Sequence, residues 1–368
     1  MILTTINKED NPNSVMVVDF RVWIDVLTSK QATLFGLLAR ELRERGHDVL
    51  VTCRDYEYTV GALRRFGLDP VVVGRYVIGD SYDKVLGDAD RIFGLAVYVE
   101  RFKPDLLIAY PNPPAARLAF GTGIKYVAIT DSPHAYVPSR LSLPLADIVI
   151  ASNCIPEEDI RKYMLRDSRL VRYEGVDEVS WLIRSSPDLS YVRSLGLELG
   201  KYLVLRPHEH HATYYKGIGT VFDLMKLVSS VLSNDLKLVF LPRYPEHEEL
   251  INKLPHSLKS KVVVIRGSYD GVSLTFYSRA VVSGGSTLAR EAALLNTLGI
   301  TYYPGFLHVN ECVRAKNYPL FKVSTAEEAL ELISKTELKE KDLKTTLEKI
   351  KNDFKDLIEV VVKVLEEV

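Results

Sequence analysis

The sequence predicts an α/β protein of two domains, each built on a parallel sheet. The chain has 368 residues, a length that suits two domains of ordinary size or one large domain. Short runs of Val, Ile and Leu lack polar alternation, as strands buried on both faces do, and they alternate with segments of helical periodicity. This alternation weakens once, near the middle of the chain, and then starts again.

The first α/β unit is expected over residues 15–178. Its first strand, residues 21–24, precedes a helix from Ser29 to Arg45, which places leucines on one face and stops at Gly46. Further strands are expected at residues 49–52, 71–73, 106–109, 126–130 and 148–150, and further helices at 56–66, 81–102 and 115–120.

Residues 179–198 are the expected linker, because Ser185, Ser186, Pro187 and Gly196 interrupt the pattern there. The second unit is expected over residues 199–340. Its strands are predicted at residues 202–205, 236–241, 262–265, 280–282 and 300–302, and its helices at 218–232, 246–254, 273–277 and 287–295.

One amphipathic helix is expected over residues 341–368. Apolar side chains recur there every three or four positions, at Leu343, Leu347, Ile350, Phe354, Leu357, Val361 and Val364. Such a stripe favours packing against the same protein, and a coiled-coil partner is the alternative.

The composition excludes several classes of protein. A net charge of −1 argues against a dominant nucleic-acid surface, and no apolar run reaches the roughly 18–20 residues that span a bilayer. Residues 1–14 read as a polar, flexible tail without the pattern of a signal peptide, which favours a cytoplasmic protein. The cysteines, Cys53, Cys154 and Cys312, are odd in number and far apart, so we expect a reducing compartment and no disulfide framework.

A phosphate-binding loop is predicted at residues 283–287. Gly284 and Gly285 follow the strand at 280–282 and allow a sharp turn with close backbone approach, and Ser286 or Thr287 can cap the following helix. The N–H groups at a helix N-terminus favour an anion, and Glu291, one turn on, can accept hydrogen bonds from ribose hydroxyls. The alternative is a tight turn with a capped helix and no ligand.

The segment at residues 283–295 resembles the C-terminal nucleotide-binding segment of the GT-B superfamily, including the non-hydrolysing UDP-N-acetylglucosamine 2-epimerases. With residues 22–28, 45–52, 130–135 and 143–147, it resembles more closely an uncharacterised prokaryotic family placed in that superfamily. The resemblance implies two Rossmann-like domains facing a central cleft, with a donor nucleotide held mainly by the C-terminal domain. It also implies a final helix that crosses back onto the N-terminal domain.

Catalytic candidates follow strands of the first unit. Asp25 precedes a polar loop that faces the cleft in the GT-B fold, so it can serve as a general base, or merely cap a helix. Lys30 in that loop can meet a phosphate, or be simply solvated. Asp131 can orient His134, which can then remove a proton from an acceptor hydroxyl; a turn with a surface histidine is the alternative.

Ligand-binding candidates follow strands of the second unit. Arg206 and Arg243 can pair with a diphosphate, and His208 is loosely similar to a histidine that lies near the ligand in the epimerases. The histidines at 208, 210 and 211 suggest a metal only weakly, and no metal ligands are predicted. Tyr269 and Asp270 stand where such folds place residues that contact the base.

Three functions remain open on the sequence. The favoured one is a glycosyltransferase of cell-envelope or glycan biosynthesis, which takes a nucleotide-diphosphate sugar, most readily a UDP-sugar, and a glycan or lipid-linked acceptor, without a further cofactor. The alternatives are a sugar-nucleotide 2-epimerase and a non-catalytic sugar-nucleotide or glycan-binding protein. A monomer and a homodimer both fit the sequence.

Overall fold

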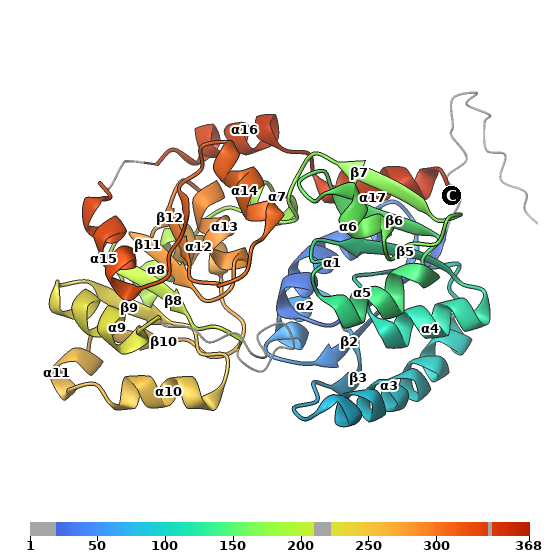
Figure 1. Cartoon of the computed structure of the whole chain (residues 1–368), viewed down its shortest axis with the longest axis horizontal. Coiled ribbons are helices and arrows are strands. Elements are labelled where there is room, and N and C mark those ends of the chain that lie inside the picture. Colours follow the sequence, from blue (N-terminus) through green and yellow to red (C-terminus); the bar gives the residue numbers. More distant parts are fainter. Residues whose placement is uncertain (1–19, 210–221, 338–340) are drawn as a thin grey trace, which may run out of the picture.

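A computed structural model gives the fold of the chain and describes residues 20–209, 222–337 and 341–368. Figure 1 shows two α/β lobes, the blue-to-green first half of the chain and the yellow-to-orange second half. Each lobe contains one parallel sheet, so the predicted fold class is confirmed. The expected tail at residues 1–14 lies outside the described residues.

The N-terminal domain holds a seven-stranded sheet in the order β3-β2-β1-β4-β5-β6-β7. The strands are β1 (Arg21–Val26), β2 (Asp48–Asp55), β3 (Val71–Arg75), β4 (Leu106–Ala109), β5 (Lys125–Thr130), β6 (Ile148–Ser152) and β7 (Arg169–Tyr173). The helices are α1 (Ser29–Glu44), α2 (Thr59–Arg65), α3 (Ser81–Phe102), α4 (Pro113–Thr122), α5 (Tyr136–Ser142), the 3-10 turn η1 (Leu143–Leu145), α6 (Glu157–Arg161) and α7 (Val179–Leu182).

The C-terminal domain holds a six-stranded sheet in the order β10-β9-β8-β11-β12-β13. The strands are β8 (Tyr202–Arg206), β9 (Lys237–Phe240), β10 (Val262–Val264), β11 (Ala280–Ser283), β12 (Leu298–Thr301) and β13 (Leu320–Lys322). The helices are α8 (Leu189–Ser194), α9 (Leu224–Ser233), α10 (Pro245–Asn252), α11 (His256–Lys259), α12 (Gly271–Phe276), α13 (Thr287–Leu294), α14 (His308–Ala315) and α15 (Ala326–Lys335). The region expected as a linker thus contains α7 and α8.

Strand order fixes where a ligand can bind. β1 neighbours β4 in the first sheet, and β8 neighbours β11 in the second, although neither pair is consecutive in the chain. At such a switch point the following loops diverge and leave a crevice beyond the carboxyl ends of the strands. Every residue of β4, β8 and β11 is buried, so these strands are held rigidly beneath those loops.

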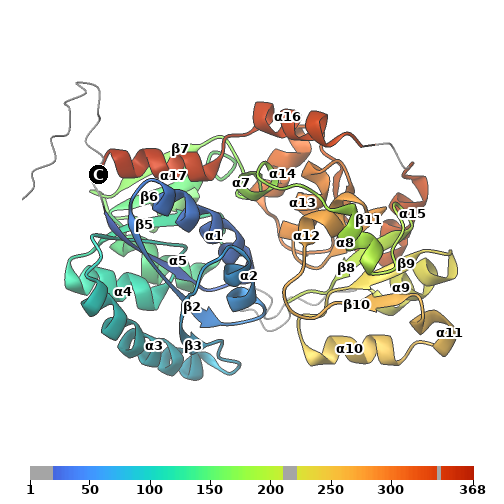
Figure 2. The ribbon, with the colours of Figure 1, turned by 180° about the vertical axis from the view of Figure 1, so that it is seen from behind.

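The C-terminal stripe forms two helices, α16 (Leu343–Asp353) and α17 (Leu357–Glu366), instead of the expected single helix. Phe354 is extended, and the Asp356 carboxylate caps α17 by accepting from the N–H of Ile358 at 3.0 Å. Periodicity did not reveal this break, because the apolar residues on both sides of it are buried. The predicted return to the N-terminal domain is confirmed, because α17 packs against α1 and α7 (Figure 2).

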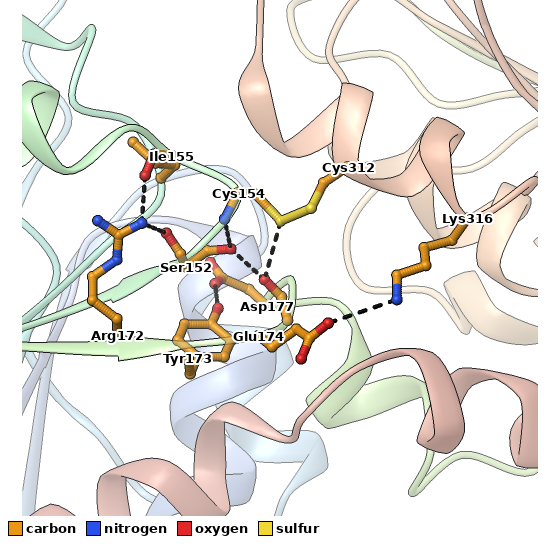
Figure 3. Close-up of a disulfide and its surroundings, with 10 residues drawn as sticks. Ser152, Cys154, Ile155, Arg172, Tyr173, Glu174, Asp177, Cys312 and Lys316 are labelled. Atoms are coloured by element: carbon orange, nitrogen blue, oxygen red, sulfur yellow. Dashed lines mark hydrogen bonds and ion pairs between the residues drawn. A yellow bond between two sulfur atoms is a disulfide. The ribbon is translucent and has the colours of Figure 1, made fainter.

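A disulfide joins the two domains, contrary to the prediction that the cysteines would stay reduced. Cys154 follows β6, and Cys312 lies in α14, with the two Cα atoms 5.6 Å apart (Figure 3). The two cysteines are 158 residues apart in the sequence, and such a separation does not reveal that they lie close together in the fold. The argument from cysteine usage for a reducing compartment therefore no longer holds.

We expect each chain with an intact bridge to contain one free thiol. Of three cysteines, two form the bridge, which leaves the buried Cys53. Titration with a thiol reagent in denaturant should give one thiol before reduction and three after it. A double Cys154→Ser, Cys312→Ser variant should lose about 2–4 kcal/mol of unfolding free energy. Three thiols in the unreduced chain would contradict the bridge.

Candidate functional site

A cleft of about 1020 Å³ lies between the domains. Its N-terminal wall comes from the loops after β1, β2, β4 and β5, and its C-terminal wall from the loops after β8, β9, β10 and β11 and from the start of α13. These include the loops at both switch points, so the cleft lies where the strand order predicts a ligand. A volume of this size exceeds that of most single small-molecule pockets.

The glycine turn before α13 is shaped by its neighbours. A Cβ atom on Gly284 would lie 2.4 Å from the Cα of His208, so the backbone of the β8 loop leaves room only for glycine. A Cβ on Gly285 would lie 3.5 Å from the Arg243 guanidinium, which places this glycine at the cleft wall beside a cation. Close approach, rather than a left-handed backbone, explains Gly284, whereas at Gly285 a Cβ would make only ordinary van der Waals contact.

Ser286 is the N-cap residue of α13, but its side chain does not cap the helix as predicted. Its hydroxyl accepts instead from the Asn310 amide at 3.2 Å and lies 3.4 Å from the Thr301 hydroxyl. The helix therefore begins without a side-chain cap, and Thr287 and Leu288 line the cleft there. An uncapped N-terminus carries the partial positive charge that favours an anion.

Arg206 and Arg243 converge at the cleft on one carboxylate from the opposite domain. Arg206 Nη2 donates to both oxygens of Glu57, at 3.1 and 3.2 Å, and Arg243 Nη1 donates to one of them at 2.6 Å. Burial alone would raise the pKa of Glu57, but the two guanidinium groups hold it at about 2. The two arginines thus form a buried anion-binding pair.

Two tyrosines fix the direction of the Arg206 side chain. Arg206 Nη1 donates to the hydroxyl of Tyr58 at 2.9 Å and to that of Tyr269 at 2.5 Å. Burial opposes the charge of Arg206, but Tyr269, Tyr58 and Glu57 together keep its pKa well above the usual value. Tyr269 and Asp270 both line the cleft, and the Asp270 carboxylate caps α12.

Glu291 faces the cleft from the second turn of α13. The indole Nε1 of Trp181, in α7, donates to its Oε1 at 3.1 Å. Burial, reinforced by the charge of Glu178 and opposed by the Trp181 hydrogen bond, raises the pKa of Glu291 to about 8. The carboxyl group is therefore mostly protonated at neutral pH and can both donate and accept hydrogen bonds.

This raised pKa predicts how stability depends on pH. The unfolded chain ionises Glu291 near the ordinary value of 4.5, whereas the folded chain keeps the proton up to about pH 8. The folded state therefore loses stability as pH rises from 4.5 to 8. Glu291→Gln should remove this loss. The melting temperature of the variant, relative to that of the wild type, should therefore rise as pH increases from 4.5 to 8. A difference that does not change with pH would contradict the prediction.

Lys30, Asp131 and Asp177 form an ion-pair cluster on the N-terminal wall. The Lys30 ammonium pairs with Asp131 and lies 2.7 Å from Asp177. Burial opposes the charge of Lys30, but the two carboxylates raise its pKa above the usual value. Tyr110 and Tyr173 also donate to Asp177, at 2.5 and 2.7 Å, so this carboxylate anchors the cluster.

Asp131 and His134 both line the cleft. Burial raises the pKa of Asp131, but Lys30 outweighs it and brings the value to about 2, so Asp131 is ionised. The side chain of His134 is exposed to solvent. The protein atoms around it lower its pKa below 6.5, while the charge of Asp131 acts in the opposite direction. His134 is therefore neutral at pH 7 and able to accept a proton.

Asp25 does not belong to the cleft wall, and its predicted role as a general base needs correction. The side chain is fully buried, and Arg91 holds it with two contacts of 2.7 Å. Asn112 and Thr52 also donate to this carboxylate, the latter at 2.5 Å. A carboxylate surrounded in this way holds neighbouring strand ends together and has no lone pair directed at a substrate.

His208 lies behind the glycine turn rather than at the cleft wall. Its backbone N–H donates to the Tyr302 hydroxyl at 3.1 Å, and its ring packs edge-on against that tyrosine. It is absent from the described lining of the cleft, so its predicted catalytic role loses its basis. Residues 210 and 211 lie outside the described residues. Across the ranges that are described, no group of three His, Cys, Asp or Glu side chains is placed to hold a metal.

The sequence prediction missed Glu57, which lines the cleft. It also missed Asp177 and Glu178, which lie behind the wall and pair with the lining residues Lys30 and Arg290. Glu178 forms a buried ion pair of 2.6 Å with Arg290, in α13, and so joins the domains. Asp177 and Glu178 follow β7, an edge strand of sequence Arg-Leu-Val-Arg-Tyr. Its two arginines leave only a short apolar run, and the strand was not predicted. A prediction of β7 would have indicated both residues, because polar groups beyond the carboxyl end of a strand are candidates for a site in this fold.

The model of one protein family, described as a protein of unknown function (DUF354), matches residues 20–366, so the chain belongs to this family. An uncharacterized protein of Methanocaldococcus jannaschii, MJ0665, is 25% identical over 296 residues, which cover 78% of this chain and 83% of the relative. None of the helices that the structure describes is long and apolar enough to span a membrane.

Solved structures resemble this fold across nearly the whole chain. A UDP-N-acetylglucosamine 2-epimerase from Rickettsia bellii has a TM-score of 0.67 at 14% identity, covering 95% of this chain and 96% of that one. The UDP-GlcNAc 2-epimerase of Methanocaldococcus jannaschii in complex with UDP-GlcNAc and UDP gives 0.68 at 12%, covering 95% and 100%. A glycosyltransferase from Rickettsia africae gives 0.56 at 13%, covering 95% and 98%. The GT-B fold is therefore shown.

Proposed function

We propose that this protein is an enzyme that binds a nucleoside-diphosphate sugar in the interdomain cleft and transfers its glycosyl group to an acceptor. One observation carries the proposal. Arg206, Arg243, the glycine turn and Glu291 lie in one wall of the cleft, and guanidinium groups, a helix N-terminus and a carboxyl group are groups that can bind a diphosphate joined to a ribose. A UDP-sugar is the expected donor, since similar folds were solved with UDP-GlcNAc and UDP.

Each part of the wall has a role in this proposal. Arg206, Arg243 and the N-terminus of α13 neutralise the charge that develops on the diphosphate as it leaves. Glu291 binds the ribose hydroxyls. The proposal assigns neutralisation of the diphosphate to protein groups and requires no cofactor beyond the sugar nucleotide.

The opposite wall supplies the proposed acceptor side. His134, neutral at pH 7, accepts the proton of the attacking hydroxyl. Lys30 and Asp131, fixed to each other, hydrogen-bond the sugar or the acceptor. The cleft volume of about 1020 Å³ leaves room for an acceptor beside the donor.

A 2-epimerase remains the second candidate, because several of the similar folds carry that name. Elimination and re-addition at the sugar C2 would exchange the C2 hydrogen with solvent without any acceptor. Glycosyl transfer breaks the anomeric bond and leaves C2 untouched. Incubation of each sugar nucleotide in deuterated water, followed by NMR, therefore separates the two reactions.

The first test is a thermal-shift screen with UDP, GDP, CDP, ADP and their common sugar conjugates. A ligand that binds only the folded state stabilises it by about 2.7 kcal/mol at a hundredfold excess over Kd. We expect one nucleotide series to raise the melting temperature, and Glu291→Ala to abolish the shift. No shift with any nucleotide would argue for the non-catalytic alternative.

A further inference from the structure

Glu57 is held in an unusual conformation at the contact between the domains. It lies between β2 and α2 with φ +49°, in the left-handed region that residues other than glycine rarely adopt. Its side chain is only 8% exposed. Such a backbone costs on the order of 1–3 kcal/mol and persists where surrounding contacts enforce it.

Those contacts are the ones that a phosphate would make. Two guanidinium groups from the C-terminal domain donate to the Glu57 carboxylate at 2.6–3.2 Å, and the Ser29 hydroxyl, at the start of α1, donates to Oε2 at 2.9 Å. Arg243 also lies beside the Gly285 turn. The Glu57 carboxylate, a planar anion with two oxygens, thus binds the two arginines that the proposed function assigns to the diphosphate.

We propose that Glu57 is an intramolecular competitor of the donor diphosphate for Arg206 and Arg243, so that donor binding displaces Glu57 and breaks this ion-pair contact between the domains. The inference rests on the proposed function, since the diphosphate is the anion that takes the place of Glu57. Like charges repel strongly in a buried site. A diphosphate and an ionised Glu57 therefore cannot share the two arginines at full strength.

Competition of this kind lowers affinity in a measurable way. The apparent Kd equals the intrinsic Kd divided by the fraction of molecules whose arginines are available. Removal of the competing charge should therefore tighten the binding of any diphosphate, whether or not it carries a nucleoside. The same change should loosen the contact between the domains.

The test compares Glu57→Gln with the wild type by isothermal titration calorimetry, with inorganic pyrophosphate and UDP as probes. We expect Glu57→Gln to bind both probes at least tenfold more tightly. Glu248→Gln is the matched control: it removes a surface carboxylate that pairs with Arg266 away from the cleft, and it should bind as the wild type does. Ser29→Ala keeps the Glu57 charge but removes its hydrogen bond, so it should tighten binding by a smaller factor.

Each outcome bears on the competition or on the proposed function. Equal or weaker binding by Glu57→Gln overturns the competition, while the function stands if Glu291→Ala still abolishes UDP binding. If UDP binds no more tightly than pyrophosphate in every variant, the nucleotide function fails, yet a tenfold gain for pyrophosphate still supports the competition. No binding of either probe to either protein overturns both. Circular dichroism checks folding, and if Glu57→Gln does not fold, unchanged affinity in Ser29→Ala overturns the competition.

Discussion

Arg91→Met is expected to lower the free energy of unfolding by about 3–5 kcal/mol, because it leaves the buried Asp25 carboxylate without its cation. Arg91 is 4% exposed and Asp25 is fully buried, so water cannot replace the lost charge. The Trp23 indole donates to Thr52, which in turn donates to Asp25. Fluorescence of Trp23 during urea unfolding therefore reports on this region.

The measurement is cleanest in a Trp181→Phe background, because the chain has two tryptophans. Arg161→Met is the matched control, since Arg161 pairs with Glu157 on the surface, one helical turn away. Solvent screens such a pair, so the urea midpoint of this control should barely move. An equal loss in both variants would show that the Asp25–Arg91 pair does not hold the strand ends together.

His134→Ala is expected to lower the rate of the proposed transfer by about 10²–10⁴-fold, the range that a general base contributes. Donor affinity should stay unchanged, because the nucleotide contacts lie on the opposite wall of the cleft. The measurement is release of the nucleoside diphosphate from the sugar nucleotide identified by thermal shift. His256→Ala, which removes an exposed histidine of α11, is the matched control and should keep the full rate.

The pH dependence of this rate gives an independent check on His134. A histidine must be neutral to accept a proton, so the rate should fall as pH falls through its pKa. The protein atoms around the exposed ring lower that pKa, with Asp131 opposing, so the acidic limb should lie below pH 6.5. The limb should disappear in His134→Ala. If the limb persists with its midpoint unchanged, another group is the base.

The sequence predicted the fold well because buried strands, and their alternation with helices, leave strong local signals. Unbroken apolar runs mark β4, β6 and β8, and the glycine turn before α13 stands where β11 ends. β7 was not predicted because its two arginines leave only a short apolar run. The break between α16 and α17 was not predicted because it does not disturb the apolar period.

The site was harder to predict, because a residue type and a strand end do not reveal partners. Asp25 was expected to follow a strand as a catalytic carboxylate would. It lies inside β1, and Arg91 reaches it from α3, 66 residues further along the chain. Arg206 and Arg243 were predicted to meet an anion. The anion that both of them contact is Glu57, and Arg243 also pairs with Glu209. The role of each residue depends on contacts between segments that are far apart in the chain, and a single sequence does not reveal those contacts.

The return of the C-terminal helix also constrains the order in which the protein can be made. α17 contributes Leu357, Ile358 and Val361, all at most 1% exposed, to the apolar core of the N-terminal domain. During synthesis on the ribosome, the N-terminal sheet emerges first, but this part of its core stays open until α17 has left the exit tunnel, after the whole C-terminal sheet. The N-terminal domain is translated first but completes its core only when α17 is added. A chain cut short before α17 would expose an apolar surface to chaperones and proteases.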